Sequence, residues 1–124
     1  MAGTVKLTAY LHTAITVRDL KRAQAFYEGV LGLQPVPRSL DFPGIWYEIG
    51  GVQIHLIVQP HAHPERPDPH RWGRNPHLAL AVADLHQAER ELIHAGYPVR
   101  KSTSGRAALF TQDPDGHILE LNQA

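Results

Sequence analysis

The chain has 124 residues, which suits one domain with a sizeable core and is too short for two independent ones. Twelve basic and twelve acidic side chains cancel, and this balance gives no support for nucleic acid or an anionic membrane surface as a partner. There is no cysteine, which excludes disulfides and thiolate metal ligands, and no apolar run is long enough to span a bilayer. A cytoplasmic location is therefore the default prediction.

Two stretches of the chain resemble each other at a constant offset. HTAITVRDLKRA begins at His12 and HLALAVADLHQA begins at His77, 65 residues later. Carried further along the chain, the same offset places His55 on Glu120. Self-similarity of this kind indicates two copies of one structural unit. We predict a single domain over residues 1–124, made of repeats at about 8–58 and 76–122.

The first copy opens with an alternating apolar stretch over residues 11–17, which predicts a strand. Asp19 follows as a helix N-cap, and apolar residues then recur at helical spacing up to Gly32, which suits the position just past a helix. Turn residues break the remainder into three strand candidates, at residues 34–38, 45–49 and 52–58.

Residues 59–76 are rich in proline and histidine and predict a long surface loop, of the kind that is disordered or acts as a lid. The second copy then repeats the pattern of the first. A strand over 77–82 precedes a helix that runs from Asp84 to Gly96, and strand candidates follow at 98–101, 107–111 and 117–122. The predicted unit is βαβββ, twice, and the predicted class is α+β.

Four residues in this pattern can bind a metal ion. His12 and His55 lie on the first and last strands of copy one, 43 residues apart, and His77 and Glu120 have the same separation in copy two. Strand alternation places all four on faces opposite the apolar stripes, where two units curling together would surround one cavity. A lone histidine on such a strand is more often a hydrogen-bonded core residue. Coincidence does not readily give four ligands at repeat-equivalent positions. Three imidazoles and a carboxylate suit one divalent Zn, Ni, Co, Mn or Fe ion.

The sequence resembles the vicinal oxygen chelate superfamily, which contains glyoxalase I, methylmalonyl-CoA epimerase, extradiol dioxygenases and fosfomycin-resistance proteins. The segments that carry the resemblance are LHTAITVRDLKRAQAFYEGVLGL (11–33), VQIHLIV (52–58), PHLALAVADL (76–85) and DPDGHILEL (113–121). The resemblance implies a curved, incomplete mixed β-barrel around a metal, with ligands from the first and last strands of each unit. It also implies a homodimer, in some relatives with each site shared between two chains.

The resemblance favours a lyase or isomerase of the glyoxalase or epimerase type, in which the ion binds vicinal oxygens of a small substrate and stabilises an enediolate. Glu120 is the candidate base and His55 could share that task, while pure coordination is the alternative for both. Glyoxalase I proteins usually carry glutamate where this chain has His55.

Two other functions remain open. An Fe²⁺-dependent dioxygenase of the extradiol type would use His12, His77 and Glu120. A non-catalytic protein that binds small molecules such as drugs or antibiotics is the third reading, and the full ligand set argues against it. The sequence does not identify the substrate, the native metal, a glutathione dependence or a site shared between chains.

Three further residues are candidates for contact with substrate. Arg74 and Arg106 could hold an anionic group, although a solvated surface arginine is the commoner outcome. Trp46 and Tyr47 alternate on a short strand, so that one faces the cavity and the other the core. Tyr47 is the one that we assign to the substrate.

Overall fold

A computed structural model describes residues 3–64 and 68–124. Each half of the chain supplies four strands and one helix, and a short 3₁₀ helix precedes the second half. In order they are β1 (His12–Val17), α1 (Leu20–Tyr27), β2 (Gln34–Val36), β3 (Gly44–Ile49), β4 (Val52–Val58), η1 (Trp72–Arg74), β5 (His77–Val82), α2 (Leu85–His94), β6 (Val99–Lys101), β7 (Ala108–Gln112) and β8 (Ile118–Gln123). Over the described ranges, no helix is long and apolar enough to cross a membrane.

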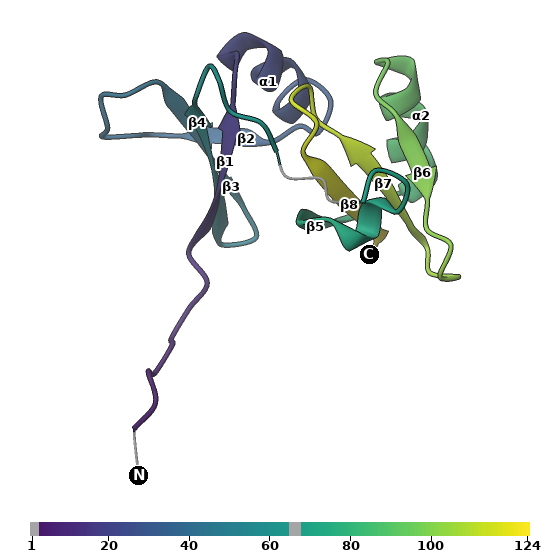
Figure 1. Cartoon of the computed structure of the whole chain (residues 1–124), viewed down its shortest axis with the longest axis horizontal. Coiled ribbons are helices and arrows are strands. Elements are labelled where there is room, and N and C mark those ends of the chain that lie inside the picture. The colour runs from purple at the N-terminus through teal and green to yellow at the C-terminus, as the bar shows by residue number, and fades with distance from the viewer. Residues whose placement is uncertain (1–2, 65–67) are drawn as a thin grey trace.

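The strands form two four-stranded mixed sheets, which we call sheet A and sheet B. Sheet A has the order β1-β4-β3-β2 and sheet B the order β5-β8-β7-β6 (Figure 1). In each sheet the first strand of the unit pairs in parallel with the last, while the other neighbours are antiparallel. The sheets are not closed into a complete barrel. The predicted α+β class and the incomplete barrel are confirmed.

Both helices begin at the predicted aspartates. The Asp19 carboxylate accepts the amide of Arg22 at 3.2 Å, and the Asp84 carboxylate accepts the amide of Gln87 at 3.1 Å. These bonds satisfy amides that have no partner within the first helical turn. α1 ends at Tyr27, earlier than predicted, and the chain continues in turns to Gly32, whose φ of 71° is one that glycine adopts without strain.

One apolar core joins the two halves. It is built from the helix-facing side of each sheet, with α1 lying between the sheets (Figure 1). The Phe26 ring meets Tyr27 and Tyr97 edge-on, at 4.9 and 4.8 Å between centroids. The fully enclosed members include Val17, Phe26, Tyr27, Leu56, Leu119 and Leu121. We call the other face of each sheet its open face. On sheet B this face is partly covered by η1, whose Trp72 forms a second, smaller apolar cluster with Phe110 and Ile118.

The β7–β8 turn (residues 113–117) fastens sheet B to the first half of the chain. The Tyr27 hydroxyl donates to the buried Asp113 carboxylate at 2.6 Å. The Asp115 carboxylate accepts the backbone amide of Arg18 at 3.0 Å and its guanidinium Nε at 2.9 Å. Three charge-assisted bonds thus tie this turn to both ends of α1, to Arg18 just before the helix and to Tyr27 at its last residue.

The same turn makes two further bonds to the first half of the chain, one of them from Arg22 Nη2 to the carbonyl of Pro114 at 3.2 Å. His117 Nε2 donates to the backbone carbonyl of Thr16 at 2.6 Å, from the face opposite Glu120, as strand parity predicts.

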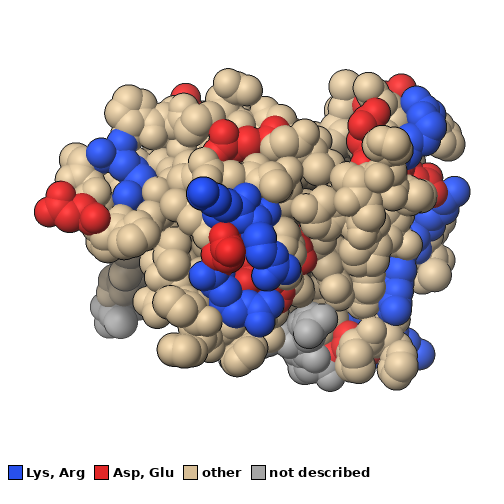
Figure 2. Space-filling view, turned by 90° about the horizontal axis from the view of Figure 1, so that it is seen from above, with Lys and Arg blue, Asp and Glu red and all other residues tan. Residues whose placement is uncertain are grey.

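In Figure 2, acidic and basic side chains intermix at the centre of this side of the molecule, and basic ones also follow the edge on which Figure 1 draws α2 and β6.

The predicted loop over residues 59–76 is partly folded. Its last part contains η1, and Trp72 and Asn75 within it are buried. Residues 65–67 of that loop lie outside the described residues. At the other end of the chain, residues 3–11 run away from the body as an extended arm (Figure 1), exposing the large apolar side chains of Val5, Leu7 and Leu11.

Replacing Tyr27 with phenylalanine removes the hydroxyl that donates to Oδ2 of the buried Asp113 carboxylate, while Oδ1 keeps the amides of Asp115 and His117. We expect the Tyr27→Phe substitution to lower the free energy of unfolding by about 1–3 kcal/mol. Urea denaturation at fixed protein concentration measures this change. The control is Tyr10→Phe on the exposed arm, and equal stability of the two variants would contradict the proposed fastening.

Candidate metal centre

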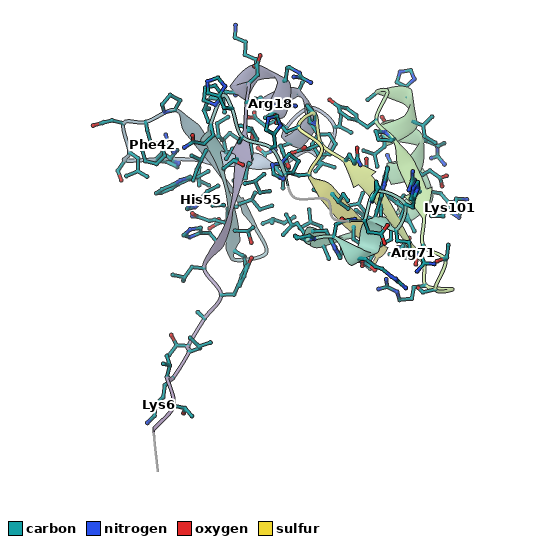
Figure 3. The ribbon with its side chains drawn as sticks, in the orientation of Figure 1. Lys6, Arg18, Phe42, His55, Arg71 and Lys101 are labelled. Atoms are coloured by element: carbon teal, nitrogen blue, oxygen red, sulfur yellow. The ribbon has the colours of Figure 1, made fainter. Side chains whose placement is uncertain are left out.

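His12 and His55 form the first half of the candidate centre, on the open face of sheet A. Their rings stack with centroids 4.0 Å apart and planes 13° from parallel. Trp46, opposite His55 in the β3–β4 ladder, also stacks on His55, at 4.4 Å and 11°. Figure 3 shows His55 on the side of sheet A that faces away from sheet B. Stacking fixes the plane of the His55 ring before any ligand binds.

The environment of His55 favours the neutral imidazole. Burial lowers its pKa, and the charges of His12 and Arg38 lower it further. His55 Nε2 lies 2.8 Å from the side-chain oxygen of Gln53, on the same face of β4. A neutral imidazole is the form that binds a metal ion, so the lowered pKa suits a ligand.

Arg38 lies beside this half of the site, against two aromatic rings. Its guanidinium carbon is 4.8 Å from the centre of the Phe42 ring and 5.9 Å from that of Trp46. Its Nε and Nη2 atoms are buried and make no hydrogen bond to any described residue. Burying unpaired donors costs free energy, so the buried guanidinium of Arg38 lowers the stability of the folded chain.

Substituting Arg38 with methionine keeps an unbranched stem against Phe42 and Trp46 and removes the unpaired donors. We expect the stability of Arg38→Met to equal that of the parent protein or to exceed it by about 1 kcal/mol. Thermal or urea unfolding of the two proteins tests this. A loss of stability of that size or more would show that the guanidinium has a partner in solution.

His77 and Glu120 form the second half, on the open face of sheet B. His77 Nδ1 lies 2.7 Å from the backbone carbonyl of Asn75, which can only accept, so Nδ1 carries a proton. The lone pair of a neutral ring is then on Nε2, which lies 3.3 Å from Glu120 Oε1. The Nε2 lone pair and the Glu120 carboxylate oxygen are both acceptors, and they repel each other at this distance. A proton on Nε2 or a metal ion beside both atoms removes this repulsion. This donor set fits a divalent ion.

The other carboxylate oxygen of Glu120 is already held. Oε2 accepts from the Asn122 amide at 2.7 Å and from Arg106 at 3.4 Å. Burial raises the pKa of Glu120, but Asn122, Arg106 and His77 together outweigh burial and hold the pKa below its ordinary value. Glu120 is therefore an anion, with Oε1 directed at His77.

Asn75 fixes the position of His77 through the backbone. Its side-chain amide donates to the carbonyls of Asp68, Arg71 and Trp72, at 2.6–3.2 Å, and its oxygen accepts the Asp68 amide at 2.8 Å. This buried network closes the end of the linking segment and aims the Asn75 carbonyl at the His77 ring. Orientation by an outer partner is typical of metal-binding histidines.

The geometry predicts the tautomer of His77. In neutral, metal-free protein, ¹⁵N NMR should find the His77 proton on Nδ1, because the Asn75 carbonyl accepts it. The exposed His86 serves as the internal control, since no described group accepts from its Nδ1. A proton on Nε2 of His77 would contradict this arrangement.

The four predicted ligands lie in two pairs, one on each open face. Over residues 3–64 and 68–124, no three His, Cys, Asp or Glu side chains come close enough to hold a metal ion together. The four ligands therefore do not share one cavity within a chain. A cavity of about 380 Å³ between the edges of β1 and β5 is lined by both halves, and His77 is the one predicted ligand among its lining residues. The core between the sheets directs the two open faces away from each other.

The assignment of Tyr47 to the substrate needs correction. Tyr47 is fully buried on the helix-facing side, and its hydroxyl donates to Glu28 at 2.8 Å. Trp46 is the residue on the open face. The sequence contains the information for this assignment. The Gly50-Gly51 turn predicts a two-residue hairpin, which pairs Trp46 with His55. Paired residues point to the same face of a sheet.

The two predicted arginines lie on the sheet B side. Arg106 contacts Glu120, as described above, and Arg74 is exposed at the end of η1. Phe110, which sequence reasoning missed, meets the His77 ring edge-on at 5.8 Å and pairs with Glu120 across the β7–β8 ladder. Each half-site thus has an aromatic neighbour on the adjacent strand.

Comparison with known proteins agrees with this architecture. The sequence profile of the Glyoxalase/Bleomycin resistance protein/Dioxygenase superfamily matches residues 9–121. The chain belongs to this superfamily. It is 30% identical to Glyoxylase I 4 of Arabidopsis thaliana, over 93% of this chain and 70% of the relative. It is also 30% identical to the lactoylglutathione lyase of Salmonella typhimurium, over 92% and 91% of the two chains.

Solved structures of this superfamily share the fold. A glyoxalase family protein from Bacillus anthracis superposes with a TM-score of 0.78 at 20% sequence identity, covering 98% of both chains. The relatives' names support a glyoxalase-type lyase within the superfamily.

Proposed function

We propose that the protein is a metal-dependent lyase or isomerase of the glyoxalase type, acting as a homodimer whose metal sites are shared between chains. The observation that supports this best is the pair of complementary half-sites. One offers two imidazoles and the other an imidazole with a carboxylate, each on an open face. Joined, they make the four-ligand set of His12, His55, His77 and Glu120.

A second copy of the chain can supply the ligands that each half-site lacks. Each open face presents ordered ligands with no further ligand from its own chain among the described residues. A two-fold dimer that apposes sheet A of one protomer to sheet B of its partner would form two equivalent sites.

Apolar side chains near the His12–His55 face support such a contact. Leu40 and Phe42, in the β2–β3 loop, are 43% and 47% exposed, and Leu11, next to His12, is 72% exposed. Leu40 and Phe42 lie two residues apart in one loop, and neighbouring exposed apolar groups support a surface that is covered in a dimer.

A divalent transition metal held by the four ligands would supply Lewis-acid polarisation of two neighbouring substrate oxygens. The side chains of the protein carry out the proton transfers. In our proposal Glu120 takes a carbon-bound proton from the substrate and returns it to the adjacent carbon. A hemithioacetal of a 2-oxoaldehyde is thereby converted to a 2-hydroxyacyl thioester with no net gain or loss of atoms. His55, stacked between aromatic rings, serves as a ligand and an alternative base.

Complementation tests the shared site. His55→Ala and Glu120→Ala each damage both sites of a homodimer. Equal mixing of the two variants, with subunit exchange, gives half heterodimers, each with one intact site. We expect recovery of about a quarter of the parent activity and metal binding. If both halves of a site came from one chain, mixing would restore nothing.

The reaction is tested with hemithioacetals of a 2-oxoaldehyde and several thiols, followed by thioester absorbance. We expect Glu120→Gln to lose roughly 100-fold or more in kcat, because the proton acceptor is gone. Glu91→Gln, on the exposed face of α2, is the control. Oxygen uptake with catechols and ferrous ion, in place of thioester formation, would instead indicate a dioxygenase.

A further inference from the structure

A basic cavity lies on the open face of sheet B, next to the Glu120 half-site. It has a volume of about 560 Å³ and opens between η1 and the β6–β7 connection. Its basic lining residues are Arg71, Arg74, Arg100, Lys101 and Arg106. Figure 3 shows Arg71 and Lys101 at this end of the molecule, far from His55. The volume is in the range of small-molecule sites.

The register of sheet B connects this cavity to the reacting centre. Arg100 pairs with Phe110 on β7, and Phe110 pairs with Glu120 on β8. Paired residues point to the same face, so the three side chains form a row across the sheet. Two strand spacings, on the order of 10 Å, separate the backbone at Arg100 from that at Glu120. A substrate that reacts at Glu120 can therefore extend into the cavity.

Two of the five basic lining residues form salt bridges with carboxylates. Lys101 pairs with Glu89 at 3.7 Å and Arg106 with Glu120 at 3.4 Å. Arg71, Arg74 and Arg100 make no salt bridge within 4.0 Å with any carboxylate that the structure describes. The Asp68 carboxylate lies close by, outside the lining; the backbone amide of Arg71 lowers its pKa, and the charges of Arg71 and Arg74 help to lower it. No lining residue is acidic. Such a lining suits a ligand end that is purely anionic and carries more than one charge.

Hydroxyl groups add donors of the kind that phosphate oxygens accept. Ser102, Thr103 and Ser104 line the same cavity, and the Ser104 hydroxyl accepts from Arg106 Nε at 2.9 Å. Arg100 is held in place by donating to the His70 carbonyl at 3.0 Å and by lying 4.2 Å from the centre of the Trp72 ring. The cavity thus combines several cations, one of them held in place by its own contacts, with neutral donors.

We propose that this cavity binds a phosphate or diphosphate group carried by the substrate. The substrate is then a phosphorylated molecule with its reacting carbons near Glu120 and its phosphate among Arg71, Arg74 and Arg100. That the phosphate belongs to the substrate rests on the proposed function. Anion binding by the cavity does not depend on it.

Calorimetric titration of the metal-free full chain with inorganic pyrophosphate tests the proposal, and metal-free protein avoids chelation by the probe. Arg71→Ala/Arg74→Ala, both at exposed positions, removes two cavity cations. Lys21→Ala/Arg90→Ala, on exposed sites of α1 and α2, removes the same charge elsewhere. We expect the cavity variant to bind about tenfold more weakly or worse, and the control variant to bind as the parent does.

NMR gives a second readout, since pyrophosphate should shift the backbone amides of residues 102–104 in the parent protein. Absence of pyrophosphate binding, or equal weakening in both double variants, would overturn the proposal. Binding of succinate as tight as that of pyrophosphate would also overturn it, because the cavity would then select carboxylates. The titration measures binding without turnover, so its outcome does not depend on whether the lyase assay succeeds.

Discussion

The attachment of the β7–β8 turn to both ends of α1 determines how the rest of the molecule is arranged. Tyr27 and Arg18 hold Asp113 and Asp115 of that turn, mostly out of water. With the turn fixed there, the helix-facing sides of both sheets share one core, and the ligand-bearing faces point away from each other. The division of the candidate centre into two half-sites follows from this packing and not from the ligands themselves.

Each half-site is ordered but electrostatically incomplete. His55 is held by stacking on His12 and Trp46, while His77 and Glu120 direct two acceptors at each other. Arg38 contributes donors that no described residue accepts. Preformed groups with unmet partners cost stability in the isolated chain and lower the reorganisation needed when a cation and a substrate bind. The arrangement is the one expected of a site completed by other molecules.

Much of this architecture could be predicted from patterns along the sequence, without knowing which distant residues come into contact. The repeat, the aspartate caps and the faces of the four candidate ligands all follow from spacing and alternation. The packing of one half on the other could not, because it depends on contacts such as Tyr27–Asp113, 86 residues apart. The folded end of the linking segment depends on the Asn75 network, whose asparagine looks like an ordinary loop residue in the sequence. Trp46 was predictable in principle from the two-residue hairpin, whereas the basic cavity required the β6–β7–β8 register.

The turn that joins the halves is also where the two repeats differ. Two residues separate Ile49 from Val52 in the β3–β4 hairpin, whereas three separate Asp113 from His117, whose backbone groups bond at 2.9 Å. This single additional residue gives the second hairpin room for two carboxylates, and the first hairpin has only Gly50 and Gly51. The contact between the repeats is therefore one-sided. The turn of the second unit binds the helix of the first, and the corresponding Gly50-Gly51 turn has no side chain with which to bind the helix of the second.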